Sequence, residues 1–62
     1  MNYTTFSIEQ LKMLNTSTLT KKEFYQLSLN KNIQYYKFLD DNKVYIKLVN
    51  CNDSLTINIK RT

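Results

Sequence analysis

The sequence predicts an α+β fold in which two short N-terminal helices are followed by a three-stranded antiparallel β-meander. Three observations predict it. The first half of the chain contains two complete helix-start signals, the spacing of apolar residues changes from helical to alternating at Ile33, and two polar segments interrupt the second half. Because 62 residues provide one small core, we expect residues 1–62 to form a single domain.

The first helix is expected at residues 8–14. Ser7 is a typical N-cap, and Gln10 at the third helical position completes a capping box. Phe6 before the cap and Leu11 at the fourth helical position form the accompanying hydrophobic staple. Both signals locate the helix start directly after the cap.

The same signals recur in front of a second helix, expected at residues 21–29. Thr20 is the expected N-cap, and Glu23 completes its capping box. Within this helix Phe24 and Leu27 lie one turn apart, so both are expected to face the core.

The chain contains no glycine and no proline but eight asparagines. Turn positions with positive φ must therefore be taken by Asn or Asp, which tolerate the left-handed conformation better than most other residues. We expect Asn15 to end the first helix, and Asn30 or Asn32 to end the second.

Three strands are expected after the helices. Residues 33–39 are rich in β-branched and aromatic side chains, and residues 44–49 and 55–60 alternate between apolar and polar side chains. The breaks at 40–43 and 50–54 are polar and rich in Asn and Asp. Short breaks of this kind join neighbouring antiparallel strands, and they predict the meander.

Two registers are open for the first hairpin. A two-residue turn at 41–42 would turn Tyr35 and Lys37 towards the core, whereas a three-residue loop would turn Tyr36 and Phe38 there. The second is preferred because burying a lysine is costly. The strand partners are Leu39 with Val44 in the first register, and Phe38 with Ile46 and Tyr36 with Leu48 in the second. In both registers Tyr35 and Tyr36 point to opposite faces.

The strand at 55–60 is expected to leave a sheet edge. Asn58, Lys60 and Arg61 would guard that edge, or it would pair with a second copy across a two-fold axis. A homodimer would add stability, because so small a domain buries on folding only about 60% of the surface that its unfolded chain exposes. The single cysteine, Cys51, excludes an intramolecular disulfide, so a partner is the remaining source of stability.

The residue types required for most catalysis are missing, so we expect no enzymatic activity. Without histidine the usual general base is absent, and without glycine no phosphate-binding loop or dinucleotide fingerprint can form. One cysteine and no histidine cannot complete a tetrahedral zinc site. Cys51 lies beside Asp53, and a carboxylate disfavours the reactive thiolate. We therefore expect no cofactor and no metal.

The protein is expected to be cytoplasmic and to have no membrane partner. The N-terminus shows no signal-peptide pattern, and no apolar run approaches the roughly 20 residues that span a bilayer. Abundant Asn, Lys, Ile and Tyr are typical of AT-rich coding sequences, which indicates a phage or another mobile element of a low-GC bacterium.

Two surfaces are candidates for binding, and both are basic in a chain of net charge +4. The first is the second helix with the first hairpin tip, a nucleic-acid site formed by Lys21, Lys22, Tyr25, Gln26 and Lys43. Lysines at a helix N-terminus suit a phosphate. The alternative is a tyrosine-bearing sheet surface of the kind found at protein–protein hot spots, formed by Tyr35, Tyr36, Tyr45 and Lys47.

Residues 3–11 and 42–47 resemble the opening and the returning wing strand of excisionase and MerR-like winged helix-turn-helix proteins. The resemblance covers residues 3–48. It implies a DNA-binding protein whose second helix enters the major groove with Gln26 at a base edge, while Lys43 at the wing tip contacts a phosphate. The alternative function is a small phage-type inhibitor or adaptor that binds a host protein through the tyrosine and lysine sheet surface.

Overall fold

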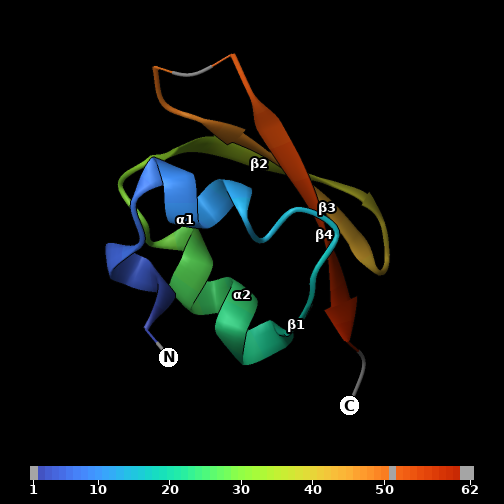
Figure 1. Ribbon diagram of the computed structural model, residues 1–62. Helices are drawn as coiled ribbons and strands as arrows, with labels where there is room; N and C mark the ends of the chain where they lie inside the picture. Colours follow the sequence, from blue (N-terminus) through green and yellow to red (C-terminus); the bar gives the residue numbers. More distant parts are fainter. Residues whose placement is uncertain (1, 51, 61–62) are drawn as a thin grey trace.

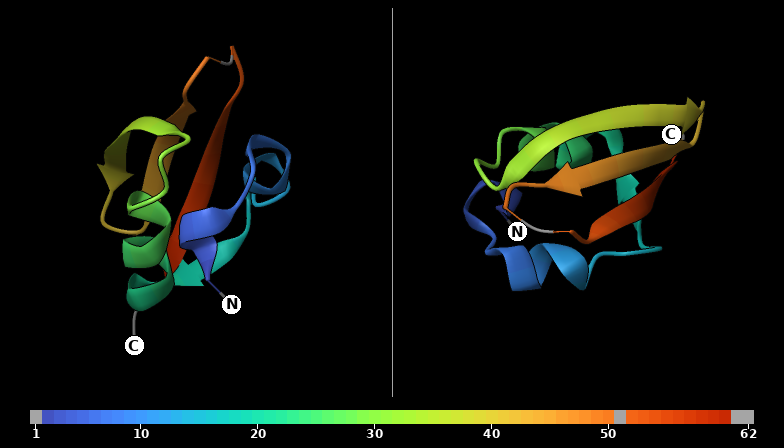
Figure 2. Two further views of the ribbon diagram at one scale, coloured as in Figure 1. Left: turned by 90° about the vertical axis from the view of Figure 1, so that its left-hand side faces the viewer. Right: turned by 90° about the horizontal axis from the view of Figure 1, so that it is seen from above.

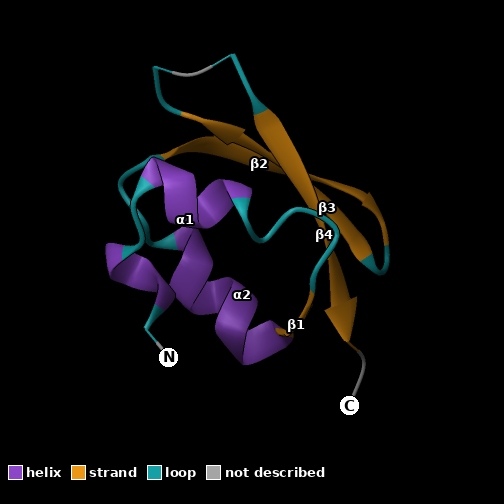
Figure 3. Cartoon of the chain, in the orientation of Figure 1, coloured by secondary structure: helices purple, strands orange, loops and turns teal. Residues whose placement is uncertain are grey.

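The computed structural model describes residues 2–50 and 52–60 and has the predicted α+β class. Its sheet, however, is mixed and four-stranded, in the order β1-β4-β3-β2 (Figures 1 and 3). Strand β1 is parallel to β4, and the other pairs are antiparallel. In chain order the elements are η1 (Tyr3–Thr5), α1 (Ile8–Lys12), β1 (Thr18–Thr20), α2 (Lys21–Ser28), β2 (Ile33–Asp40), β3 (Lys43–Leu48) and β4 (Ser54–Lys60).

The prediction of three antiparallel strands was wrong by one strand. The extra strand, β1, lies in the connection between the helices, where Leu19 pairs with Ile59 of β4. Strand β4 therefore lies between β1 and β3, and the prediction that residues 55–60 form an edge was also wrong. Asn58 and Lys60 guard no edge there, and Arg61 lies outside the described residues.

Both predicted capping boxes are present. The N–H of Gln10 donates to Ser7 Oγ at 3.2 Å, and the N–H of Ser7 donates to Gln10 Oε1 at 2.8 Å. In α2 the N–H of Glu23 donates to Thr20 Oγ1 at 3.1 Å, and the N–H of Thr20 donates to Glu23 Oε1 at 2.9 Å. The helices begin where predicted, and they end at Lys12 and Ser28, slightly earlier than expected.

Positive φ angles occur at Thr16 (67°) and Asn50 (54°) among the described residues. Asn50 follows the prediction that Asn takes such positions, whereas Asn15 was expected where Thr16 is found. Asn15 instead uses its side chain, whose Oδ1 accepts the N–H of Thr56 at 2.9 Å. The N–H of Thr16 donates to the Thr56 carbonyl at 2.7 Å. Two bonds to the sheet thus hold a β-branched residue in a conformation it rarely adopts.

The first hairpin combines features of both predicted registers. Its turn has two residues, because Asp40 pairs with Lys43. An irregularity between Phe38 and Asp40 then shifts the ladder, as a β-bulge does. The resulting partners are Tyr36 with Ile46 and Phe38 with Val44. Tyr36 and Phe38 lie on the helix side of the sheet, as preferred, but they are 45% and 51% exposed and not buried. Neither predicted register was correct.

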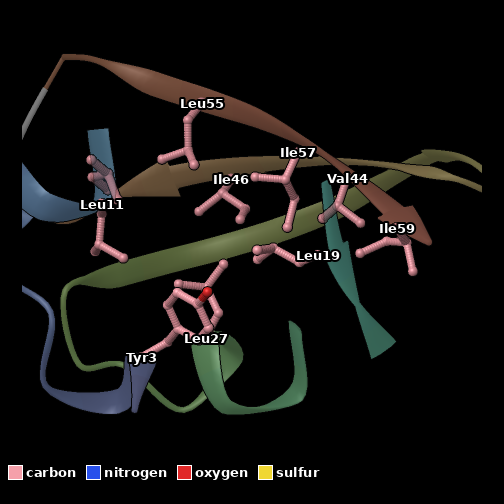
Figure 4. Packing of buried hydrophobic residues seen from close by; sticks show 10 residues of the cluster. Tyr3, Leu11, Leu19, Leu27, Val44, Ile46, Leu55, Ile57 and Ile59 are labelled. Carbon is pink, nitrogen blue, oxygen red and sulfur yellow. The ribbon is translucent and has the colours of Figure 1, made fainter. Parts of the chain in front are cut away.

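The core lies between one face of the sheet and the helices (Figures 2 and 4). Leu11 of α1 and Leu27 of α2 are fully buried against alternate residues of the strands. The whole cluster consists of Tyr3, Leu11, Leu19, Leu27, Val44, Ile46, Leu48, Leu55, Ile57 and Ile59. Strand β2 lies beyond this cluster, and seven of its eight residues are exposed.

Among the described residues, the polar side chain of Asn30 is buried with the core. Asn30, 3% exposed, donates from Nδ2 to the carbonyls of Tyr3 and Phe6, both at 2.9 Å, and its Oδ1 accepts the N–H of Asn32 at 2.7 Å. The amide therefore joins the N-terminal segment to the connection between α2 and β2. Asn30 follows the C-cap of α2, Leu29, and its side chain adds a donor to two carbonyls that also accept from the N–H of Phe6 at 3.4 Å and from Nδ2 of Asn32 at 3.0 Å.

We expect Asn30→Ala to lower the free energy of unfolding by about 1–3 kcal/mol, because it removes three hydrogen bonds of a buried amide and leaves the N–H of Asn32 without this acceptor. Asn30→Asp should destabilise similarly, since a carboxylate cannot donate to the two carbonyls. Urea unfolding followed by circular dichroism measures the effect. Asn52→Ala, at an exposed turn position, is the control and should leave the midpoint unchanged. Equal midpoints for all variants would contradict this role of Asn30.

Glu23 makes stability depend on pH. The N–H of Thr20 donates to its carboxylate and, with the Tyr3 hydroxyl at 3.2 Å, holds the pKa of Glu23 below its ordinary value of 4.5. A lowered pKa in the folded state means that the ionised group stabilises the fold at higher pH and ceases to do so on acidification.

Glu23→Gln should therefore have a lower urea midpoint than the natural protein at neutral pH. The difference should shrink as the pH falls below 4.5 and through the lowered pKa of Glu23 in the folded protein. Glu9→Gln, in the first turn of α1, is the matched control. If the difference in midpoint between Glu23→Gln and the natural protein stays constant with pH, Glu23 is not the source of the pH dependence.

Candidate functional site

The face of the sheet that points away from the helices is the candidate site. Because side chains alternate along a strand, the residues between the buried positions of β3 and β4, and their partners on β2 and β1, all lie on this face. We call it the outer face, and its basic and aromatic members are Tyr35, Lys37, Lys43, Tyr45, Lys47 and Lys60. The right-hand view of Figure 2 looks onto it.

Two tyrosines form a pair on the outer face. The rings of Tyr35 and Tyr45 have centroids 6.2 Å apart and planes inclined by 41°. Tyr35 is 50% exposed and Tyr45 is half-buried. The register places Lys47 opposite Tyr35 and Lys37 opposite Tyr45, so each ring has a lysine as its cross-strand neighbour.

The outer face is positively charged. Strands β3 and β4 contain no Asp or Glu, and β2 contains one acidic residue, Asp40, at its end. The Oδ1 of Asp40 accepts the N–H of Asn42 at 2.7 Å. Asp53, just before β4, forms an ion pair with Lys12 of α1 at 2.8 Å. Asp41 lies in the turn between Asp40 and Lys43, so three of the chain's five carboxylates lie near this face, beside its four lysines.

Polar side chains of β4 complete the outer face. Ser54, Thr56 and Asn58 alternate with the buried residues of this strand and lie beside Lys47, Tyr45 and Lys43 of β3 respectively. They offer hydroxyl and amide groups that both donate and accept hydrogen bonds. The outer face therefore combines positive charge, aromatic rings and neutral hydrogen-bonding groups on a paired, rigid sheet.

The structure does not bring the residues of the predicted nucleic-acid site to one surface. Lys21, Lys22 and Tyr25 are exposed on α2, and Gln26 is half-buried there. Lys43 lies on the outer face, across the sheet from α2. A ligand on α2 and a ligand on the outer face would thus occupy opposite sides of the molecule.

Three of the four residues of the predicted protein-binding site lie on one surface. Tyr35, Tyr45 and Lys47 are neighbours on the outer face. Tyr36 lies on the other side of β2, where its ring meets Phe24 of α2 edge-on at 5.1 Å. Tyr35 and Tyr36 pointing to opposite faces was a correct prediction.

Sequence reasoning assigned Lys37 and Lys60 to neither site. Each belongs to the outer face, and the signal for both was alternation, since Lys37 is two residues from Tyr35 and Lys60 two residues from Asn58. Of these two strands, only β4 alternates cleanly between buried and exposed positions, so the alternation could be recognised in the sequence only there. In β2 the bulges obscure it.

No group of three or more His, Cys, Asp or Glu residues that would suit a metal ion occurs within residues 2–50 and 52–60. Cys51 lies outside the described residues. Within the same ranges, no helix has the length and apolar character needed to cross a membrane.

Comparison with known proteins finds no matching family model, no matching curated protein and no matching solved structure. The geometry of the chain's own residues is therefore the basis for a functional proposal.

Proposed function

We propose that this chain is a non-enzymatic binding protein whose outer face binds single-stranded nucleic acid. The observation that carries the proposal is the tyrosine pair, Tyr35 and Tyr45, with a lysine opposite each ring on a sheet face that no described helix covers. Aromatic rings on a sheet stack with unpaired bases, and neighbouring lysines neutralise the phosphates between them.

The geometry favours a single strand over a duplex. Stacking on a protein ring requires a base whose face is free, and in a duplex both faces of each base are covered by neighbouring pairs. Each stacked base contributes about 1–3 kcal/mol of binding free energy. The lysines of the outer face add attraction that does not depend on sequence. We therefore expect binding with little sequence preference.

Binding of duplex DNA through α2 is a second candidate, which the exposure of Lys21, Lys22 and Tyr25 favours. It is the function that the winged helix-turn-helix resemblance implies. The two candidates use opposite sides of the molecule, so variants on one side leave the other unchanged.

The first prediction concerns salt. A fluorescently labelled oligothymidylate should bind, and its affinity should fall on a double-logarithmic plot against salt with a slope of roughly −3, because four lysines each release about 0.7 counterions from a single strand. Fluorescence anisotropy measures this, with a duplex of equal length as the comparison. No binding of either probe at low salt and micromolar protein would overturn both nucleic-acid candidates and favour a host protein as the partner.

The second prediction concerns the rings. Tyr35→Ala should weaken oligothymidylate binding about tenfold through the loss of one stacking contact, whereas Tyr35→Phe retains the ring and should bind normally. The double variant Lys21→Glu with Lys22→Glu should bind single strands as the natural protein does. If this double variant loses binding and Tyr35→Ala keeps it, α2 is the binding element.

A further inference from the structure

The unpaired edge of the sheet carries half-exposed aromatic side chains. Strand β2 has β3 on one side and no described strand on the other. On its helix side Tyr36 and Phe38 contact Phe24 edge-on, with ring centroids 5.1 and 5.6 Å apart. Tyr36 is nevertheless 45% exposed and Phe38 51% exposed. We call Phe24, Tyr36 and Phe38 the aromatic cluster.

The opposite edge of the sheet is formed by β1, which has three residues. Strand β1 covers the end of β4, and the segment before β1 covers more of it. The N–H of Asn58 donates to the Ser17 carbonyl at 2.8 Å, and the N–H of Thr16 donates to the Thr56 carbonyl at 2.7 Å. Backbone groups of an open strand are a template for another strand, and β2, with eight residues, offers a much longer template than the three residues of β1.

We infer that β2 pairs in antiparallel fashion with β2 of a second copy of this chain, about a two-fold axis at Tyr36. The two sheets would then form one continuous sheet, and the two aromatic clusters would meet on its helix side. This places the interface at β2 and not at the strand formed by residues 55–60, which lies inside the sheet.

The charges along β2 select a second, antiparallel copy as the occupant. Lys31 precedes the strand, and Asp40 and Asp41 follow its aromatic stretch. An antiparallel twin brings the basic start of each strand beside the acidic end of the other, twice in the dimer. A uniformly acidic segment would meet Asp40 and Asp41, and a uniformly basic one would meet the lysines, so neither matches the whole edge.

Lys37 selects the register. With the axis at Tyr36, Lys37 of each copy lies opposite Tyr35 of the other on the outer face, where its stem packs beside the edge of the ring, leaves the face of the ring open to a base, and keeps its ammonium group in water. Moving the axis to Lys37 would place the two lysines directly opposite each other, which destabilises a strand pair. An axis between two residues would pair a residue of the helix side with a residue of the outer face. The helices of the two copies would then lie on opposite sides of the sheet, so we place the axis at a residue.

The exposed area is sufficient for a reversible dimer. Tyr35, Tyr36, Phe38 and Leu39 are each 45–54% exposed, and a buried aromatic side chain removes about 150–250 Å² from water. Half of that area for the three aromatic side chains, and somewhat less for Leu39, in two copies and with the backbone edge, gives about 1,000 Å² as an upper estimate. That is the lower bound of a specific interface, so we expect dissociation on the order of micromolar.

Sedimentation equilibrium over a wide range of protein concentration tests the dimer. The natural chain should approach twice the monomer mass, and Tyr36→Asp, which places two carboxylates at the axis, should raise the dissociation constant at least tenfold. Phe38→Asp is a second variant with the same expected result. Met13→Asp is the matched control, because Met13 is 83% exposed outside the aromatic cluster, and it should dimerise normally. Circular dichroism confirms that each variant is folded.

Cross-linking tests the register. In a Cys51→Ser background, Tyr36→Cys should form an intermolecular disulfide under mild oxidation, because opposite residues of an antiparallel pair have Cα atoms about 4.5–5.5 Å apart. Lys37→Cys should cross-link far more slowly. A natural chain that stays monomeric at the highest concentration overturns the inference, and so does equal cross-linking at both positions.

Discussion

The short helical layer is the constraint on which the rest of this structure depends. α2 has eight residues and α1 five, which gives lengths of about 12 and 8 Å. Four strands spaced about 4.8 Å apart form a wider surface than these helices cover. The core therefore forms beneath β1, β4 and β3, while β2 extends past it with Tyr36 and Phe38 half exposed. The described residues form one helical layer, on the core side of the sheet, and no second layer among them covers the outer face.

Interactions between residues close in sequence were predictable. Both capping boxes join positions three apart, so the pattern that signals them is also the geometry that forms. Strand β1 was not predictable, because three residues are too few to show alternation, and Thr18–Thr20 acquires its extended pairing only from β4, about forty residues away. The left-handed conformation of Thr16 has the same origin, since its support comes from Thr56.

The candidate site depended on the same distant pairings. The residue types were visible in the sequence, but the partnership of Tyr35 with Tyr45 required the register of β2 on β3, and the bulges that set this register carry no clear sequence signal. The placement of Lys43 across the sheet from α2 likewise required the sheet order. The side chains of Asn15 and Asn30 form hydrogen bonds with backbone groups of distant segments, and these contacts also have no signal in the local sequence.

The central position of β4 has a consequence for synthesis on the ribosome. Strand β4 joins β1 to β3 and supplies Leu55, Ile57 and Ile59 to the core. Before it emerges, the growing chain holds two short helices and one hairpin, none of which buries its apolar face. A hairpin without a third strand is marginally stable in water, and pairings between distant residues form slowly. The core can therefore close only after β4, up to Lys60, has emerged from the ribosome.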